Sequence, residues 1–169
     1  MSQMPKYSLW LVPEKDTFKQ FKGIIEKLSF EHRSPMFLPH ITLLGTLPGD
    51  MDELSKKMER LAMTTGPIEV SSLELQYHDT YFRSLFLRID PVEALVELQE
   101  TASDVFGVEQ DAIFFPHLSL MYGATQQEDI INELDEDELT ILFECDALQL
   151  VQTNGPVTIW EPVAEIRLG

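Results

Sequence analysis

One short segment occurs twice in this chain of 169 residues, and the repeat constrains the fold more than any other feature of the sequence. Residues 37–43 read FLPHITL, and residues 114–120 read FFPHLSL. Each copy carries an aromatic residue, a proline, a histidine, an aliphatic residue and a hydroxyl in the same order. The repeat indicates an internal duplication, so we expect two related halves that each contribute one copy.

Hydrophobic periodicity and turn residues divide the chain into alternating strands and helices. The predicted strands are residues 6–13, 37–45, 68–77, 81–89, 114–122, 139–151 and 157–167. Between them, helices are expected to begin at residue types that favour a helix N-terminus. These starting residues are Asp16, Asp50, Asp90 with Pro91, and Thr125.

The order of these elements is βαβαβ, then βαβαβ again, then one further strand. This order predicts an α+β protein built from a duplicated βαβαβ unit, with a hairpin around the short connector at residues 78–80. Each half has only roughly 80 residues, which is small for an independent domain. We therefore expect one domain over residues 1–169, in which two pseudo-symmetric lobes share a core and leave a central cleft.

The charge of the chain limits its partners. Twelve basic residues stand against 29 acidic ones, which gives a net charge of −17. Binding to long nucleic acid depends on lysine and arginine, so any nucleotide partner should be short. Residues 34–49 and 112–127 contain no charged side chain, which favours an anionic ligand near both repeated segments, although buried strands are apolar for structural reasons as well.

The single cysteine, Cys145, excludes an internal disulfide and is typical of a reducing compartment. Residues 1–20 lack the apolar core of a signal peptide, and no later stretch approaches about 18 apolar residues. We therefore expect a cytoplasmic protein without a membrane partner, and a monomer. Cys145 lies in an apolar strand without a reactive motif, so we do not expect it to be a nucleophile.

Alternate positions of a strand point to the same side. His40 and Thr42 should therefore project together from one copy of the repeat, and His117 and Ser119 from the other. If the two halves are related by an approximate twofold axis, the two pairs converge across the cleft with a reacting atom between them.

Two imidazoles that face one reacting atom suit a displacement in which one accepts a proton from water and the other protonates the leaving oxygen. The two hydroxyls can donate hydrogen bonds to oxygens that gain negative charge. A phosphodiester would use all four groups. We expect no metal and no cofactor, because the sequence lacks the usual zinc-ligand spacings. The alternative for one histidine in an apolar strand is a structural role, but the matched pair favours catalysis.

The paired HITL and HLSL segments resemble the tandem motifs of the two-histidine phosphoesterase superfamily, also called the LigT-like fold. Residues 7–13 (YSLWLVP), residues 116–122 (PHLSLMY) and the late Trp160-Glu161 are most similar to the cyclic phosphodiesterases of the plant and fungal type. The resemblance covers nearly the whole chain. It implies two antiparallel-sheet lobes with outer helices, and hydrolysis of cyclic phosphates on ribose without a metal.

The resemblance also implies roles for particular residues. His40 and His117 would be the acid–base pair, while Thr42 and Ser119 would hold the phosphate oxygens. These four residues are the ones that the repeat itself selects.

Four further residues are expected to contact the substrate. The resemblance implies Trp10 and Tyr122, although strict alternation from His117 places Tyr122 on the opposite face unless the strand ends or bulges. Similar proteins place the segment that begins at residue 81 beside the nucleotide. Phe82 and Arg83 are therefore candidates, with Arg83 positioned to meet a second phosphate.

The function expected is hydrolysis of a cyclic phosphodiester on a small nucleotide. The resemblance implies ADP-ribose 1″,2″-cyclic phosphate or nucleoside 2′,3′-cyclic phosphates as the substrate. One alternative is an enzyme that processes 2′–5′ or 2′,3′-cyclic RNA ends, which the scarcity of lysine and arginine disfavours. The other is a non-catalytic nucleotide-binding module.

Three other features are expected to lie at the surface. His32 falls near a helix end, and His78 falls in a predicted turn, with the rim of the cleft as the alternative for His78. Residues 128–138 are strongly acidic, which is typical of a solvated helix and connector, with an interaction surface as the alternative.

Overall fold

The structure is a computed structural model that describes residues 5–109 and 113–169. Its strands are β1 (Lys6–Pro13), β2 (Ile41–Pro48), β3 (Ile68–Gln76), β4 (Leu85–Ile89), β5 (His117–Met121), β6 (Leu142–Gln152) and β7 (Glu161–Arg167). Its helices are α1 (Lys15–His32), α2 (Met51–Met63), α3 (Glu93–Phe106), α4 (Gln127–Glu133), α5 (Glu136–Leu139) and the 3₁₀ turn η1 (Val157–Ile159). Among the described helices, none is both long enough and apolar enough to cross a membrane.

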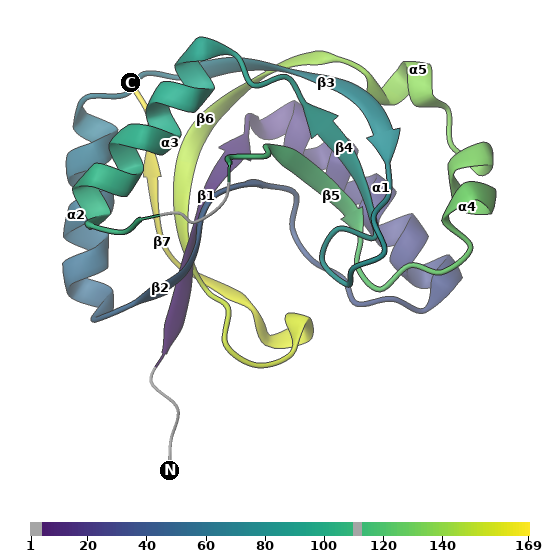
Figure 1. Ribbon diagram of the computed structural model, residues 1–169, viewed down its shortest axis with the longest axis horizontal. Helices are drawn as coiled ribbons and strands as arrows, with labels where there is room; N and C mark the ends of the chain where they lie inside the picture. Colours follow the sequence, from purple (N-terminus) through teal and green to yellow (C-terminus); the bar gives the residue numbers. More distant parts are fainter. Residues whose placement is uncertain (1–4, 110–112) are drawn as a thin grey trace.

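The strands form one antiparallel sheet in the order β1-β2-β5-β4-β3-β6-β7, and a further pairing between β1 and β6 closes it (Figure 1). Closure depends on the length of β6. The first residues of β6 pair with β3, whereas its later residues pair with β1 and β7. The result is a barrel-like sheet without a free edge along its main ring.

Each half of the chain contributes its third strand to the sheet of the other half. β1 and β2 pair with one another and are extended by β6, while β4 and β5 pair with one another and are extended by β3. The lobes are therefore equivalent, and the strands β1, β2 and β6 correspond to β4, β5 and β3. The α+β class, the duplicated unit and the pseudo-symmetric lobes predicted from the sequence are confirmed.

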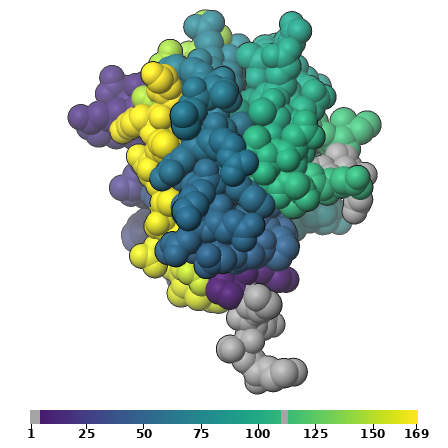
Figure 2. Space-filling view, turned by 90° about the vertical axis from the view of Figure 1, so that its left-hand side faces the viewer, coloured from purple at the N-terminus to yellow at the C-terminus, as the bar shows by residue number. Residues whose placement is uncertain are grey.

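The helices cover the outside of the sheet. α2 and α3 lie side by side over the lobe that contains β2, and β7 forms the border beside α2 (Figure 2). α1 packs against β5, and the short helices α4 and α5 lie on the same side of the molecule (Figure 1). The buried residues of α1 include Phe21, Ile25 and Leu28, which the helical period places on one face.

Several strands begin later than the sequence predicts. β2 starts at Ile41 and β5 at His117, directly after the segments that contain Pro39 and Pro116, because proline has no N–H to donate to a neighbouring strand. β4 starts at Leu85 rather than at residue 81. Residues 79–84 instead form turns and bends, so the hairpin connector is longer than predicted. The segment that begins at residue 157 is first a 3₁₀ turn, and β7 starts only at Glu161.

The predicted helix starts are also partly wrong. α1 is capped by Glu14 and not by Asp16, because the Glu14 carboxylate accepts hydrogen bonds from the N–H groups of Asp16 (3.1 Å) and Thr17 (2.8 Å). Asp50 precedes α2 as predicted but makes no side-chain cap bond. α3 begins at Glu93, after Asp90 and Pro91, and α4 begins at Gln127, two residues after Thr125.

Candidate active site

A cavity of about 320 Å³ opens where the two lobes meet at β2 and β5. It has the size of a small-ligand site. The structure brings all eight sequence-predicted residues to this one cavity. They are Trp10, His40, Thr42, Phe82, Arg83, His117, Ser119 and Tyr122.

The pairing of β2 with β5 explains why the two copies of the repeat meet. Ile41 lies directly opposite Leu118 in this antiparallel pair. Continuing the register places His40 beside Ser119 and Thr42 beside His117, on the face opposite to that of the paired residues. The two imidazoles and the two hydroxyls accordingly line the same cavity.

Each histidine is fixed in the same way. The Nδ1–H of His40 donates to the Leu38 carbonyl oxygen (2.8 Å), and the Nδ1–H of His117 donates to the Phe115 carbonyl oxygen (2.9 Å). Because a carbonyl only accepts, this contact assigns the proton of the neutral ring to Nδ1. In both residues the Nε2 atom is therefore the nitrogen available for proton transfer.

His40 is the more deeply enclosed of the two histidines. Only 5% of its surface is exposed, and its ring stacks flat on Trp10 with a centroid distance of 3.4 Å and an interplanar angle of 4°. Burial lowers the pKa of His40 to about 3, opposed by the Leu38 carbonyl bond and reinforced by the nearby His117. In the ligand-free protein His40 is neutral at physiological pH.

His117 lies in a more open setting. Its ring meets Phe86 edge to face, with centroids 5.3 Å apart at an interplanar angle of 67°. Burial lowers the pKa of His117 as well, the Phe115 carbonyl bond opposes this effect, and the nearby Arg83 and His78 add to it. A bound anion would reverse both shifts, because it stabilises the charged imidazolium form.

The two hydroxyls occupy equivalent positions of the lobes. Thr42 pairs with Trp10 across β1 and β2, and Ser119 pairs with Phe86 across β4 and β5. The Ser119 hydroxyl donates to the Phe82 carbonyl oxygen at 3.3 Å, a long bond that an acceptor in the cavity can replace.

Tyr122 reaches the cavity because β5 ends at Met121, which answers the objection from strict strand alternation. The following residue, Gly123, has a positive φ of 65° that reverses the chain, and a side chain there would meet the Tyr81 ring. The Tyr122 ring stacks on Phe37, with centroids 3.9 Å apart. Burial raises the pKa of the Tyr122 hydroxyl, so this group stays protonated and can only be a hydrogen-bond donor or acceptor.

Arg83 dominates the charge of the cavity. Of the described residues that line it, Arg83 is the only lysine or arginine, and none is a carboxylate. Its guanidinium lies over the Phe115 ring at 5.2 Å from the centroid, which orients the charge without neutralising it. In a chain of net charge −17 this cavity is therefore suited to an anion.

Five further residues line the cavity and were not predicted from the sequence. They are Ser8, Gly45, Thr46, Thr153 and Trp160. Trp160 belongs to the loop before β7 and stacks on Phe82 with centroids 5.6 Å apart, which forms an aromatic wall. One signal was available for Ser8. The segment SLWL at residues 8–11 is repeated as SLFL at residues 84–87, and the two occupy equivalent strands.

The remaining chemistry-bearing residues lie elsewhere. Cys145 is buried, and burial raises the pKa of its thiol, so it is not a nucleophile. His78 and His32 are half-buried rather than exposed, which corrects the sequence prediction. The His78 ring packs against Phe115 behind His117, and the backbone N–H of His78 donates to the Arg83 carbonyl oxygen at 2.8 Å.

The duplicated sheet and the paired histidines at its junction define a two-histidine phosphoesterase of the LigT-like fold. The chain belongs to the family described as cyclic phosphodiesterase-like proteins, whose family model matches residues 4–168. The chain is therefore an enzyme of the cyclic phosphodiesterase class.

Two relatives support this assignment over nearly their full length. A cyclic phosphodiesterase of Arabidopsis thaliana is 25% identical, with 96% of this chain and 94% of the relative covered. A 2′,3′-cyclic-nucleotide 3′-phosphodiesterase of Phaeosphaeria nodorum is 26% identical, with 98% of this chain and all of the relative covered.

Solved structures show the same fold at lower identity. Escherichia coli LigT, in a complex with 3′-AMP, superposes with a TM-score of 0.64 at 12% identity, covering 98% of this chain and 99% of LigT. A protein of Thermus thermophilus superposes with a TM-score of 0.63 at 13% identity, covering 96% of this chain and 97% of that protein. These similarities concern the fold alone.

Proposed function

We propose that this protein hydrolyses a cyclic phosphodiester on a small nucleotide, without a metal, by acid–base catalysis between His40 and His117. ADP-ribose 1″,2″-cyclic phosphate and nucleoside 2′,3′-cyclic phosphates are the proposed substrates. The observation that carries the proposal is that equivalent histidines of the two halves line one cavity and bond a carbonyl through Nδ1 in the same way.

The chemistry follows from the two available Nε2 atoms. The neutral imidazole accepts a proton from a water molecule as the water oxygen bonds to phosphorus. The bond from phosphorus to one ribose oxygen breaks, and that oxygen takes a proton from the other, protonated imidazole. The product is a phosphate monoester beside a free hydroxyl. The two imidazoles have exchanged protonation states, and exchange with solvent restores them.

The hydroxyls and the arginine supply the complementary charge stabilisation. Thr42 and Ser119 can donate to the non-bridging oxygens, which carry most of the negative charge as the water attacks. Arg83 lies in the same cavity and can pair with a second phosphate of a dinucleotide-like substrate.

The aromatic lining favours a nucleotide over a bare phosphodiester. Trp160 and Phe82 stack with centroids 5.6 Å apart, and a base or ribose can pack against such a wall. The Phaeosphaeria nodorum relative is named for 2′,3′-cyclic nucleotides, and LigT has been solved with 3′-AMP, ATP and NADP⁺. These names support small nucleotides as the ligand class here.

Hydrolysis of the two proposed substrates in the presence of EDTA tests the proposal. We expect turnover of at least one of them to survive EDTA. Loss of turnover that zinc restores would contradict metal-independent chemistry, and tight nucleotide binding without any hydrolysis would favour a binding module instead.

A comparison of substrate lengths tests the RNA alternative. We expect a cyclic mononucleotide to be hydrolysed at least as fast as an oligonucleotide with the same terminus. A strong preference for the oligonucleotide with a steep salt dependence would instead favour RNA-end processing. The cytoplasmic location and the monomeric state stay predictions from the sequence.

A further inference from the structure

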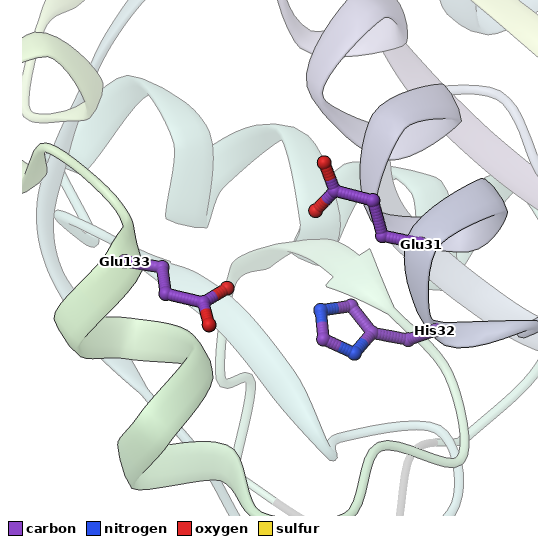
Figure 3. Close-up of side chains that lie close together, drawn as sticks. All are labelled: Glu31, His32 and Glu133. Atoms are coloured by element: carbon purple, nitrogen blue, oxygen red, sulfur yellow. The ribbon is translucent and has the colours of Figure 1, made fainter.

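A second cluster of chemistry-bearing side chains lies outside the cavity, where the end of α1 meets the end of α4. Glu31 and His32 come from the last turn of α1, and Glu133 is the last residue of α4. Each of the three residues offers one ligand atom, and these three atoms all lie within 4.8 Å of one another. Figure 3 shows the Glu133 carboxylate pointing across to the His32 ring, with the Glu31 carboxylate on the other side of the gap.

The His32 ring carries the observation that points to a ligand. Its Nε2 atom is buried, yet it has no hydrogen-bond partner among the described residues. A buried polar atom without a partner is costly, and native proteins rarely leave one unexplained. In Figure 3 this nitrogen is the ring atom turned toward the two carboxylates. An ion pair with either carboxylate does not explain it, because neither forms a salt bridge with His32.

The surroundings of the cluster favour a positive charge. An adjacent cavity of about 260 Å³ is lined by Glu31 and Glu133 and also by Asp135 and Glu138, against one lysine, Lys27. The cluster also lies at the C-terminal end of the 18-residue helix α1, where the helix dipole is negative.

We propose that Glu31, His32 and Glu133 bind a divalent cation of the zinc class. One imidazole nitrogen and two carboxylate oxygens suit Zn²⁺, which takes such ligands at about 2.0–2.2 Å, with water completing the shell. Ligand atoms around tetrahedral zinc are about 3.4 Å apart, so three atoms within 4.8 Å of one another need to close by up to about 1.4 Å. Both glutamates are exposed and free to make this adjustment. Magnesium and calcium prefer oxygen ligands alone, so the histidine selects against them.

The bound cation would link the helix that precedes the first copy of the repeat to the helix that follows the second copy. α1 is followed by the segment that carries Phe37 and His40, and α4 follows the segment that carries Tyr122. Phe37 and Tyr122 stack on one another. None of the three proposed ligands lines the catalytic cavity, so the cation does not enter the hydrolysis chemistry.

Calorimetric titration of the untagged, metal-free protein with zinc chloride tests this site. We expect one Zn²⁺ per chain, and a loss of affinity of at least about tenfold in both His32→Ala and Glu133→Gln. Glu133→Gln keeps the shape of an exposed side chain, so it reports on binding even if His32→Ala folds poorly. Glu26→Gln is the matched control, because it removes the same charge from α1 outside the cluster.

Thermal unfolding gives an independent reading. At a zinc concentration about a hundredfold above Kd, we expect the Tm of the unaltered protein to rise by roughly 5 °C, and the Tm of Glu133→Gln to rise by much less. Equal zinc affinity in Glu133→Gln and in Glu26→Gln would overturn the proposal. Magnesium or calcium binding as tight as zinc binding would also overturn it.

Discussion

His40 and His117 come from equivalent positions of the two halves, and each bonds the carbonyl two residues before it through Nδ1, at 2.8 Å and 2.9 Å. Their neighbours differ. His40 lies flat on Trp10, whereas His117 meets Phe86, the residue equivalent to Trp10, edge to face. The duplication therefore fixes the geometry of the pair, while substitutions around it give the two imidazoles different environments.

The same comparison holds for charge. Burial is the main cause of the lowered pKa in both histidines, but Arg83 and His78 lower the pKa of His117 further, whereas His117 does so for His40. In a symmetric site the two imidazoles would have equal pKa values, and either one could carry the proton. The fuller burial of His40 separates the two pKa values, whereas Arg83, by lowering the pKa of His117, reduces this separation. Separated pKa values favour a state with one neutral and one protonated imidazole.

The largest expected effect is the loss of either histidine. His40→Ala and His117→Ala should each lower kcat by about a hundred- to ten-thousandfold, because each removes one proton-transfer group. Turnover of a cyclic nucleotide by folded protein, checked by circular dichroism, measures this effect. His78→Ala is the matched control and should stay within about tenfold of the unaltered protein. Near-normal turnover in either first variant would contradict the paired mechanism.

The second effect concerns the hydroxyls. Thr42→Val and Ser119→Ala should each lower kcat/KM by about a hundred- to thousandfold, if both donate to the same phosphate group. Steady-state kinetics measure this loss. Thr153→Val removes a cavity-lining hydroxyl outside the repeat, and its loss should be below about tenfold. A large loss for one repeat hydroxyl and none for the other would show that only one half holds the phosphate.

The pH dependence of kcat/KM and kcat reports the protonation states of the two imidazoles. Because the pKa values of both histidines are lowered in the free protein, the singly protonated pair is most abundant below pH of about 6.5. We expect a bell-shaped profile of kcat/KM with its maximum below that pH. On the alkaline side, kcat/KM should decrease by up to about tenfold per pH unit. The kcat maximum should lie at higher pH, because the bound phosphate raises both pKa values. A kcat/KM that increases from pH 6.5 to 8 would contradict this account.

The smallest effect is on stability. The pKa of His40 is lowered to about 3 in the folded protein. Between this pH and about 6.5, His40 is therefore protonated in the unfolded chain and neutral in the folded chain. Stability should therefore fall as the pH falls, by up to about 1.4 kcal/mol per pH unit from this group. Denaturant unfolding at pH 6 and pH 4 should show a smaller drop for His40→Gln than for the unaltered protein. An identical drop would mean that His40 is not buried as a neutral group.

Features set by residues close together in the chain could be predicted from the sequence, whereas features set by residues far apart in the chain could not. The repeated segments and the period of two along a strand were sufficient to group His40 with Thr42 and His117 with Ser119. The closing pair between β1 and β6 brings together residues far apart in the chain, and no local pattern reports it. For that reason Thr153 and Trp160, which reach the cavity through this closure, were not predicted as site residues.

The errors in the predicted boundaries have local causes. The helix start at Asp16 was wrong because Glu14, a longer carboxylate two residues earlier, reaches the same N–H groups. The strand start at residue 81 was wrong because a hydrogen bond between His78 and Arg83 closes a turn there. Both cases are competitions between neighbouring groups that residue preference alone does not decide.

A structure of the protein with bound inorganic phosphate would show whether the paired histidines and hydroxyls of the two halves bind one phosphate. The account predicts one phosphate whose oxygens lie about 2.7–3.2 Å from Nε2 of His40, Nε2 of His117 and the hydroxyls of Thr42 and Ser119. A phosphate that contacts the groups of one half only, or that binds outside the cavity, would contradict it.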